Sequence, residues 1–277
     1  MTASFETLAT DLDHPEGVAA GPDGLLYAGG EAGQIYRIDA DGSVREIAST
    51  GGFIYGVTLD AFGNVYACDY GNASVMRISS EGLVTTYSTG TAGRPMRVPN
   101  FSAFDGEGNL YVTDSGEWGD DDGVIYRVAK DGTTVVWADL APRFPNGCCL
   151  DADERTLLVV ESHGRAIVRI PIREDGTAGE PQRVADLTGS QPDGIALAED
   201  GSMFVGCYRP DSIFRVRPDG SFDVFAEDPD GVLLNQPTNV AFAGESLDRL
   251  VVSSLGGWSL VAADAGVRGV PLRYPAL

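Results

Sequence analysis

Four residues with oxygen-bearing side chains occupy equivalent positions in successive repeats of this sequence. Short segments of the type proline, variable residue, glycine, or close variants of it, begin near residues 15, 54, 99, 145, 192 and 237. Their variable positions hold, in order, Glu16, Tyr55, Asn100, Asn146, Asp193 and Thr238. A purely structural position would repeat one residue type, whereas this one holds two carboxylates and two amides. Carboxylate and amide oxygens are the ligands that hard divalent cations prefer.

The side chains of Glu16, Asn100, Asn146 and Asp193 are therefore candidates for one divalent metal site. If they converge, the two carboxylates need a cation or a proton, because unpaired carboxylates at short range repel each other. The all-oxygen set favours Ca²⁺ and leaves Zn²⁺, Mg²⁺ and Mn²⁺ open. The other interpretation is that these residues cap strand starts as Asx turns. That reading suits a single Pro-Asn-Gly segment better than four converging ones.

The segments belong to a repeat of about 45 residues with four strands in each unit. A unit contains a short apolar strand, an Asp-Gly type turn, a second strand, a loop and an alternating strand such as IYRI or IFRV. A second turn and a fourth strand follow. The chain is therefore predicted to be an all-β, six-bladed β-propeller around a central channel, with residues 1–277 as a single domain. A β-sandwich or a pair of barrels explains six aligned repeats less well.

The ends of the chain suggest how the ring closes. The sixth unit lacks a further strand after SLVAAD, and its tail, GVRGVPLRYPAL, is interrupted by prolines. Residues 4–12, SFETLATDL, precede the first unit and alternate as a strand would. We predict that they form the outer strand of blade six, because closure by a terminal segment removes an open sheet edge. The first strand of each blade would then be innermost, with all six variable positions at one mouth of the channel.

Composition excludes several classes of function. With 19 Lys and Arg against 41 Asp and Glu, the net charge is −22, so we predict no nucleic-acid or membrane partner. The single lysine, Lys130, lies in a turn-like AKDG segment, which argues against Schiff-base chemistry. Two histidines argue against an imidazole-rich metal site. The absence of a secretory signal and of paired CxxC cysteines predicts a cytoplasmic protein, either a monomer or a small homo-oligomer.

The motifs resemble those of the SMP-30/gluconolactonase/luciferin-regenerating enzyme family. The resemblance rests on HPEGV, VPNFSAFDGEGNLYVTD, FPNGCCLDADERTLLVVES and QPDGIALAEDGSMFVG, and it extends in order along essentially the whole chain. It implies a six-bladed propeller that hydrolyses lactones with one divalent metal on the channel axis. It assigns the family's metal ligands to Glu16, Asn146 and Asp193, and it places Asn100 in contact with metal or substrate.

The resemblance also implies a mechanism. The metal polarises the lactone carbonyl and activates water, Asp193 accepts the proton of that water, and Asn100 helps to stabilise the oxyanion. His14 and His163 offer a competing base, since some related propeller lactonases use a histidine dyad. One alternative function is a phosphotriesterase-type hydrolase on the same metal site. Another is a non-enzymatic propeller that binds a ligand or protein around a structural metal. A strictosidine-synthase-like lyase agrees least with the polar set.

The loops at the expected metal mouth predict an aromatic substrate pocket. Its candidate residues are Tyr55, Trp118, Phe144, His14, His163 and Tyr208. Sugar-lactone hydrolases of this family often carry an arginine two residues before the asparagine at the Asn100 position. Here that residue is Val98, and Arg97 is one step out of register. The expected substrate is therefore a small-molecule lactone or ester that is less polar than an aldonolactone.

Overall fold

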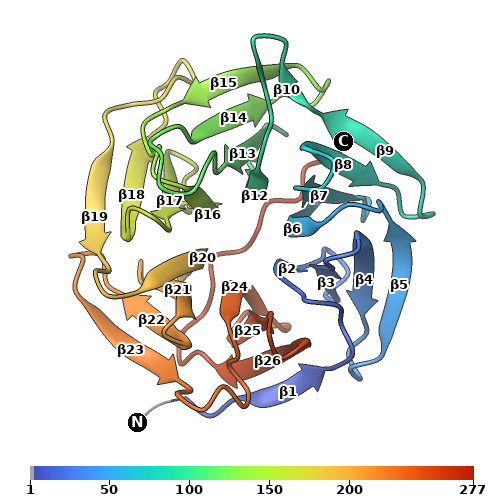
Figure 1. Cartoon of the computed structure of the whole chain (residues 1–277), viewed down its shortest axis with the longest axis vertical. Coiled ribbons are helices and arrows are strands. Elements are labelled where there is room, and N and C mark those ends of the chain that lie inside the picture. Colours follow the sequence, from blue (N-terminus) through green and yellow to red (C-terminus); the bar gives the residue numbers. More distant parts are fainter. Residues whose placement is uncertain (1–2) are drawn as a thin grey trace.

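Short runs of β-branched and aromatic residues, separated by turns that contain glycine at positive φ, form the regular elements of this protein. The computed structural model describes residues 3–277 and contains 26 strands and no helix within that range. Six four-stranded antiparallel sheets surround a central axis (Figure 1). The predicted six-bladed all-β propeller is confirmed. No segment of the described chain forms a helix that could cross a membrane.

The strands of each blade follow one another from the axis to the rim. Blades one and two consist of β2 (Val18–Ala20), β3 (Leu26–Gly29), β4 (Gln34–Ile38) and β5 (Val44–Ser49), then β6 (Ile54–Leu59), β7 (Val65–Asp69), β8 (Ser74–Ile78) and β9 (Val84–Ser88). Blades three and four consist of β12 (Pro99–Phe104), β13 (Leu110–Asp114), β14 (Val124–Val128) and β15 (Thr134–Ala138), then β16 (Pro145–Leu150), β17 (Thr156–Glu161), β18 (Ala166–Pro171) and β19 (Gln182–Asp186).

Blade five consists of β20 (Gln191–Leu197), β21 (Met203–Arg209), β22 (Ser212–Val216) and β23 (Phe222–Glu227). Blade six consists of β24 (Pro237–Ala243), β25 (Arg249–Ser254), β26 (Ser259–Asp264) and the N-terminal strand β1 (Glu6–Ala9). A small hairpin, β10 (Gly90–Thr91) with β11 (Arg94–Pro95), lies in the connection between blades two and three.

The N-terminal strand closes the ring. Strand β1 pairs antiparallel with β26, and Glu6 lies opposite Ala262. The side chain of Leu12, just after the strand, is fully buried, and Glu6 forms an ion pair with Arg249 of β25. The prediction that an N-terminal segment forms the outer strand of blade six is therefore confirmed.

Apolar side chains pack between the faces of neighbouring blades. They form six clusters, one at each blade–blade contact, and the largest fully buried side chains include Tyr66, Tyr111, Tyr126 and Phe204. Each inner strand is thus fixed by packing on both of its faces. This packing sets the geometry of the channel, since close-packed interiors resist small displacements.

The inner strands approach each other closely just after the variable positions. A Cβ atom added at Gly17 would lie 2.3 Å from the Tyr55 carbonyl oxygen, and one added at Gly147 would lie 2.6 Å from the Cα atom of Gly194. Five of the six inner strands, β6, β12, β16, β20 and β24, also change register at the variable position. Such bulges redirect side chains out of the regular alternation of a strand, and here they affect the residues at the channel mouth.

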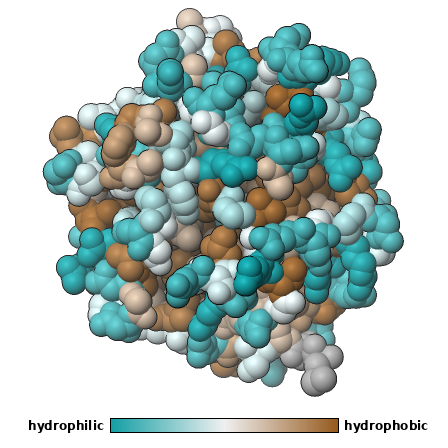
Figure 2. All heavy atoms as spheres, turned by 180° about the vertical axis from the view of Figure 1, so that it is seen from behind, coloured by the Kyte–Doolittle hydropathy of each residue, from teal (hydrophilic) through white to brown (hydrophobic). Residues whose placement is uncertain are grey.

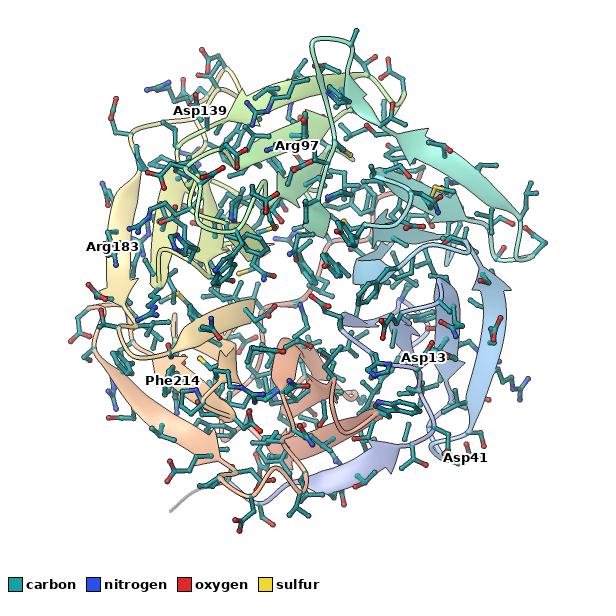
Figure 3. The ribbon with its side chains drawn as sticks, viewed as in Figure 1. Asp13, Asp41, Arg97, Asp139, Arg183 and Phe214 are labelled. Carbon is teal, nitrogen blue, oxygen red and sulfur yellow. The ribbon has the colours of Figure 1, made fainter. Side chains whose placement is uncertain are left out.

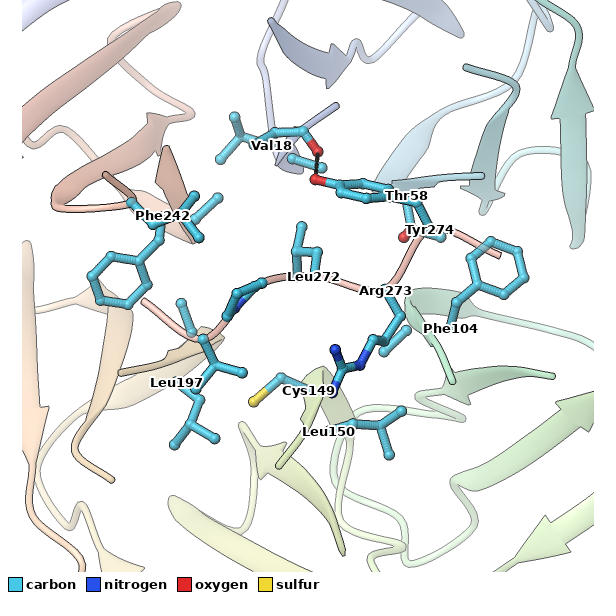
Figure 4. Close-up of a pocket in the computed structure, with 18 of the residues that line it drawn as sticks. Val18, Thr58, Phe104, Cys149, Leu150, Leu197, Phe242, Leu272, Arg273 and Tyr274 are labelled. Atoms are coloured by element: carbon cyan, nitrogen blue, oxygen red, sulfur yellow. Dashed lines mark hydrogen bonds between the residues drawn. The ribbon is translucent and has the colours of Figure 1, made fainter. Parts of the chain in front are cut away.

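The C-terminal tail crosses the channel at the far ends of the inner strands (Figure 1). Val270 donates its backbone N–H to the Leu197 carbonyl oxygen at 2.8 Å, and the Tyr274 hydroxyl donates to the Ala20 carbonyl oxygen at 2.9 Å. The tail and the strand ends surround a mainly apolar cavity of about 400 Å³, in which Leu272 and Tyr274 lie among side chains such as Leu197 (Figure 4). The tail therefore obstructs the channel end opposite the variable positions.

Several acidic side chains stabilise turns at the periphery of the ring. Asp41, Asp131 and Asp219 each accept the backbone N–H two residues further on, at 3.0, 2.9 and 2.9 Å. These bonds are the main reason why the pKa of Asp41 and Asp131 is lowered, whereas for Asp219 the hydrogen bond from the Ser221 hydroxyl lowers the pKa most and the backbone bond adds to it. Asp41 lies at the outer edge of the ring, whereas Asp13 lies nearer the centre (Figure 3). Hydrophilic and hydrophobic residues are interspersed on the face seen in Figure 2.

Deletion of residues 1–12 should lower the melting temperature strongly, because it exposes the β26 edge and removes the buried Leu12. Burial of one leucine is worth about 2 kcal/mol, and each kcal/mol shifts the melting temperature by about 2–4 °C in a chain of this size. The whole strand should thus contribute roughly 10 °C or more, measurable by calorimetry.

The control is Glu6→Ala, which keeps the strand and removes only an exposed ion pair, and which should cost about 1 kcal/mol or less. An unchanged melting temperature after the deletion would contradict this account of ring closure.

Candidate metal and substrate site

The starts of the six inner strands surround a pocket of about 290 Å³ at one mouth of the channel. Its lining consists of Glu16, Tyr55, Asn100, Trp118, Phe144, Asn146, Ser162, Gln191, Pro192, Asp193, Tyr208, Thr238 and Leu255. All six variable positions of the repeat line this one pocket. The repeat therefore brings together the four side chains predicted to bind a metal.

Glu16 and Asp193 place two carboxylates in the same poorly solvated space. Both side chains are half-buried and line the pocket. Burial raises the pKa of Glu16 well above its usual value, and the charges of Asp193 and Glu31 raise it further. Burial also raises the pKa of Asp193 to about 7, while a hydrogen bond with the Asn146 side chain acts in the opposite direction. The two carboxylates thus lack a compensating positive charge.

This donor set fits a divalent cation. Within residues 3–277 neither Glu16 nor Asp193 forms an ion pair, and none of the described residues that line the pocket is Lys or Arg. The side chains of Asn100 and Asn146 are almost fully buried, with 3% and 4% of their surface exposed. Two half-buried carboxylates and two buried amides that line one pocket offer the oxygen ligands that Ca²⁺ and similar ions prefer.

Hydroxyl groups bind the backbone of two of the candidate ligands, Glu16 and Asn146. Thr238 and Ser253 each donate a hydrogen bond to the Glu16 carbonyl oxygen, at 2.7 and 2.6 Å. Thr113 donates to the Asn146 carbonyl oxygen at 2.7 Å. In both cases the donor comes from the preceding blade of the ring, so the position of each ligand depends on its neighbour.

Aromatic side chains form part of the pocket wall. The rings of Tyr55 and Tyr70 are stacked, with centroids 5.2 Å apart. The rings of Trp118 and Phe144 meet edge to face at 4.9 Å. Phe144 has a φ of 61°, an unfavourable left-handed backbone for a bulky residue, and its contact with Trp118 helps to keep it there. The predicted pocket residues Tyr55, Trp118, Phe144 and Tyr208 therefore lie together.

The two histidines lie outside the pocket lining. His14 contacts Asp13 and Glu31 through Nδ1, at 2.8 and 2.9 Å, and its ring packs against Trp258 with centroids 4.6 Å apart. His163 packs against Trp118 with centroids 5.3 Å apart, and its Nδ1 is buried. Only His163 therefore packs against a residue of the lining, and neither histidine lines the pocket itself.

Arg97 is also directed away from the pocket. Its guanidinium group forms an ion pair with Asp122 in the following loop, and this pairing raises its pKa. Its backbone N–H is bonded to Asp114 at 2.7 Å. Neither Arg97 nor Val98 lines the pocket, so this site lacks the arginine that the resemblance associates with sugar lactones.

Sequence reasoning missed the serines beside the asparagines. Asn100 donates through Nδ2 to the Ser115 hydroxyl at 3.0 Å, and Asn146 donates likewise to Ser162 at 3.1 Å. Each serine follows the acidic residue that ends the second strand of its blade. The same alignment of repeats would have revealed them, because serine occurs at this place only in the two blades that carry asparagine.

A family comparison agrees with the motifs and the fold. The model of the SMP-30/Gluconolactonase/LRE-like region matches residues 14–256. The chain belongs to this family. The match covers all six inner strands and the four predicted metal ligands, so the resemblance inferred from the sequence is confirmed.

The curated relatives of this SMP-30/gluconolactonase family member match only parts of the chain. Lactonase drp35 of Staphylococcus saprophyticus is 30% identical over 43% of this chain and 38% of its own length. Pentonolactonase XacC of Haloferax volcanii is 27% identical over 49% and 46%. A strictosidine synthase-like protein of Arabidopsis thaliana is 29% identical over 55% and 42%. The chain thus spans less than half the length of each of these relatives.

Solved structures of low sequence identity share the fold over nearly the whole chain. A gluconolactonase from Xanthomonas campestris has a TM-score of 0.81 at 21% identity, covering 95% of this chain and 89% of that one. A calcium-binding regucalcin from Agrobacterium tumefaciens has a TM-score of 0.78 at 17% identity, covering 99% and 97%. At such identities the likeness establishes the propeller fold of this family member.

Replacing the carboxylates of Glu16 and Asp193 should abolish metal binding without unfolding the protein. Glu16→Gln and Asp193→Asn each remove one of two repelling charges, so at pH 8 without metal the melting temperature should stay equal or rise by a few degrees. We expect added Ca²⁺ to stabilise the natural protein and to have no such effect on the two variants. Differential scanning calorimetry with and without Ca²⁺ measures both effects. A Ca²⁺-induced shift that survives in both variants would contradict this assignment.

Proposed function

We propose that this protein is a metal-dependent lactonase, which opens a cyclic ester at the pocket of the channel mouth. The observation that carries the proposal is the pair of half-buried carboxylates, Glu16 and Asp193, beside two buried amides with no basic side chain in the lining. The names of two curated relatives, a lactonase and a pentonolactonase, support the reaction class. The calcium-binding structural neighbour supports Ca²⁺ as the ion.

In this proposal Glu16, Asn100, Asn146 and Asp193 hold the ion. A bound divalent cation supplies positive charge that polarises an ester carbonyl and lowers the pKa of a nearby water. Asp193 accepts a proton from the attacking water, and the oxygen of that water forms a bond to the carbonyl carbon. The bond from that carbon to the ring oxygen then breaks, and the proton passes to the leaving alkoxide, giving a hydroxy acid.

Asn100 and the aromatic walls position the substrate. One Nδ2 hydrogen of Asn100 is donated to Ser115, and the other can be donated to the oxygen that gains charge during the reaction. Tyr55, Trp118 and Phe144 cover the substrate from above and exclude water. Burial and the neighbouring carboxylates strongly raise the pKa of Tyr55, which keeps its hydroxyl group neutral and able to donate a hydrogen bond.

The lining favours a neutral lactone that is less polar than an aldonolactone, or an aryl ester. A phosphorylated or carboxylated substrate would find no cationic side chain there, because Arg97 is paired with Asp122. The aromatic rings offer flat apolar surfaces instead. The cytoplasmic location and the monomeric or small homo-oligomeric state stay predictions.

A panel of substrates with and without metal tests this function. Gluconolactone, an alkyl lactone, an aromatic lactone and a phosphotriester should be compared before and after chelation and after addition of Ca²⁺, Zn²⁺, Mg²⁺ or Mn²⁺. We expect the less polar lactones to be hydrolysed fastest, and metal removal to lower kcat/KM by about 100-fold or more. Full activity after elemental analysis shows the metal to be gone would exclude metal dependence. A strong preference for gluconolactone would exclude the apolar substrate class.

The role of Asp193 as base predicts a large loss of turnover in Asp193→Asn, with kcat lowered by about 1,000-fold or more. The variant should retain its far-UV circular dichroism spectrum. Asp186→Asn, which changes an exposed carboxylate of β19, is the matched control and should keep normal kinetics. Near-normal kcat in Asp193→Asn would remove Asp193 from the mechanism.

A further inference from the structure

An asparagine can bind a cation through only one end of its amide. The carbonyl oxygen Oδ1 is a ligand, whereas the Nδ2 group carries hydrogens and repels a positive charge. Rotation by 180° about the last side-chain bond exchanges the two ends at little steric cost. A site with two asparagine ligands therefore needs something that fixes both amides with oxygen toward the ion.

Two serines meet this need through hydrogen bonds of fixed direction. The Ser115 hydroxyl donates to the Pro145 carbonyl oxygen at 2.8 Å, and the Ser162 hydroxyl donates to the Pro192 carbonyl oxygen at 2.6 Å. A carbonyl oxygen can only accept, so each serine has used its one hydrogen. Its oxygen must then accept from a neighbour, and that neighbour is the Nδ2 group of the asparagine.

The opposite amide orientation would be unfavourable. With Asn146 rotated, its Oδ1 would face the Ser162 oxygen, and neither atom would have a hydrogen to share. Ser162 and Asn146 are 4% exposed, so water has little access to relieve this contact. A buried acceptor without a donor is costly, which makes the observed orientation strongly preferred. The same holds for Asn100 with Ser115, which is fully buried.

The hydrogen bonds of Ser115 and Ser162 connect successive candidate ligands around the ring. Pro145, the acceptor for Ser115, immediately precedes Asn146, and Pro192, the acceptor for Ser162, immediately precedes Asp193. Each serine thus orients the amide of its own blade and binds the backbone next to the ligand of the following blade. Hydrogen bonds and the chain itself therefore connect the ligand positions of blades three, four and five.

The placement of the serines follows the asparagines. The position of Ser115 in the repeat is held in the other blades by Glu31, Tyr70, Ser162, Tyr208 and Leu255. Serine is found there only in blades three and four, the two blades with an asparagine ligand. A role common to all blades would not produce this distribution.

We propose that Ser115 and Ser162 are positioning residues that fix the Asn100 and Asn146 amides with their oxygens toward the cation. This inference rests on the proposed function for the identity of the ligand. Neither serine is assigned a nucleophilic role, because each hydroxyl hydrogen is committed to a backbone carbonyl.

The test measures Ca²⁺ affinity by calorimetry on the full-length protein, with CaCl₂ as the only ligand. Ser162→Ala should weaken binding by about 10–100-fold, the usual effect of losing a group that orients a metal ligand. Ser162→Thr keeps the hydroxyl and should restore most of the affinity. Ser102→Ala is the matched control, since Ser102 is a buried serine of β12 whose hydroxyl has no hydrogen-bond partner among the described residues. It should bind Ca²⁺ normally.

A second background distinguishes orientation from general damage. In Asn146→Asp the two side-chain oxygens are equivalent, so rotation of the group no longer matters. Adding Ser162→Ala there should not weaken Ca²⁺ binding and should leave it equal or stronger, because it removes the contact between the serine oxygen and a carboxylate oxygen; this would be a strongly non-additive result. Wild-type affinity in Ser162→Ala, or an equal loss in both backgrounds, would overturn the proposal.

If the natural protein binds none of Ca²⁺, Mg²⁺, Mn²⁺ and Zn²⁺, the proposed function fails. The positioning role of the serines is then tested on the metal-free protein. Side-chain amide NMR should then show that the Asn146 Nδ2 hydrogens exchange slowly with solvent in the metal-free protein and faster in Ser162→Ala, because the mutation removes their hydrogen-bond acceptor. Signals that are the same in both proteins would overturn the positioning role.

Discussion

The presence of two carboxylates that repel each other in one channel mouth is the constraint on which the candidate site depends. Glu16 and Asp193 come from blades one and five, far apart in sequence, and neither has an ion-pair partner among residues 3–277. Bringing such groups together costs free energy that packing elsewhere has to offset. The six apolar clusters between the blades provide that packing, and the glycines beside the candidate ligands allow the inner strands to approach each other closely.

Most of the fold could be predicted because each repeat carries its strand and turn signals within a short stretch of sequence. Turn glycines, alternating strands and a constant spacing define the six blades, and the missing strand of blade six pointed directly to β1. The four candidate ligands were predictable for the same reason, since symmetry converts an equal place in each repeat into a common place in space. The resemblance to a family added the assignment of roles, which periodicity alone does not provide.

What the sequence did not reveal depends on contacts between blades or on irregular segments. The bonds from Ser115 and Ser162 reach a carbonyl in the following blade, and no pattern within one repeat shows such a partner. The path of the C-terminal tail depends on single contacts such as that of Tyr274 with Ala20. The positions of His14 and His163 outside the pocket lining depend on loop conformation, including the left-handed backbone of His14. Loops of this kind carry little periodic signal.

The pairing of β1 with β26 also limits when the ring can close during synthesis on the ribosome. Residues 6–9 leave the ribosome early, yet their partner at residues 259–264 is made more than 200 positions later. Until then the first strand and the incomplete sixth blade both have open edges, which invite pairing with other chains. The acidic side chains spread over the turns reduce that hazard, since like-charged nascent chains repel one another. The ring becomes continuous only after residues 259–264 have been made, and residues 270–274 then lie across one end of the channel.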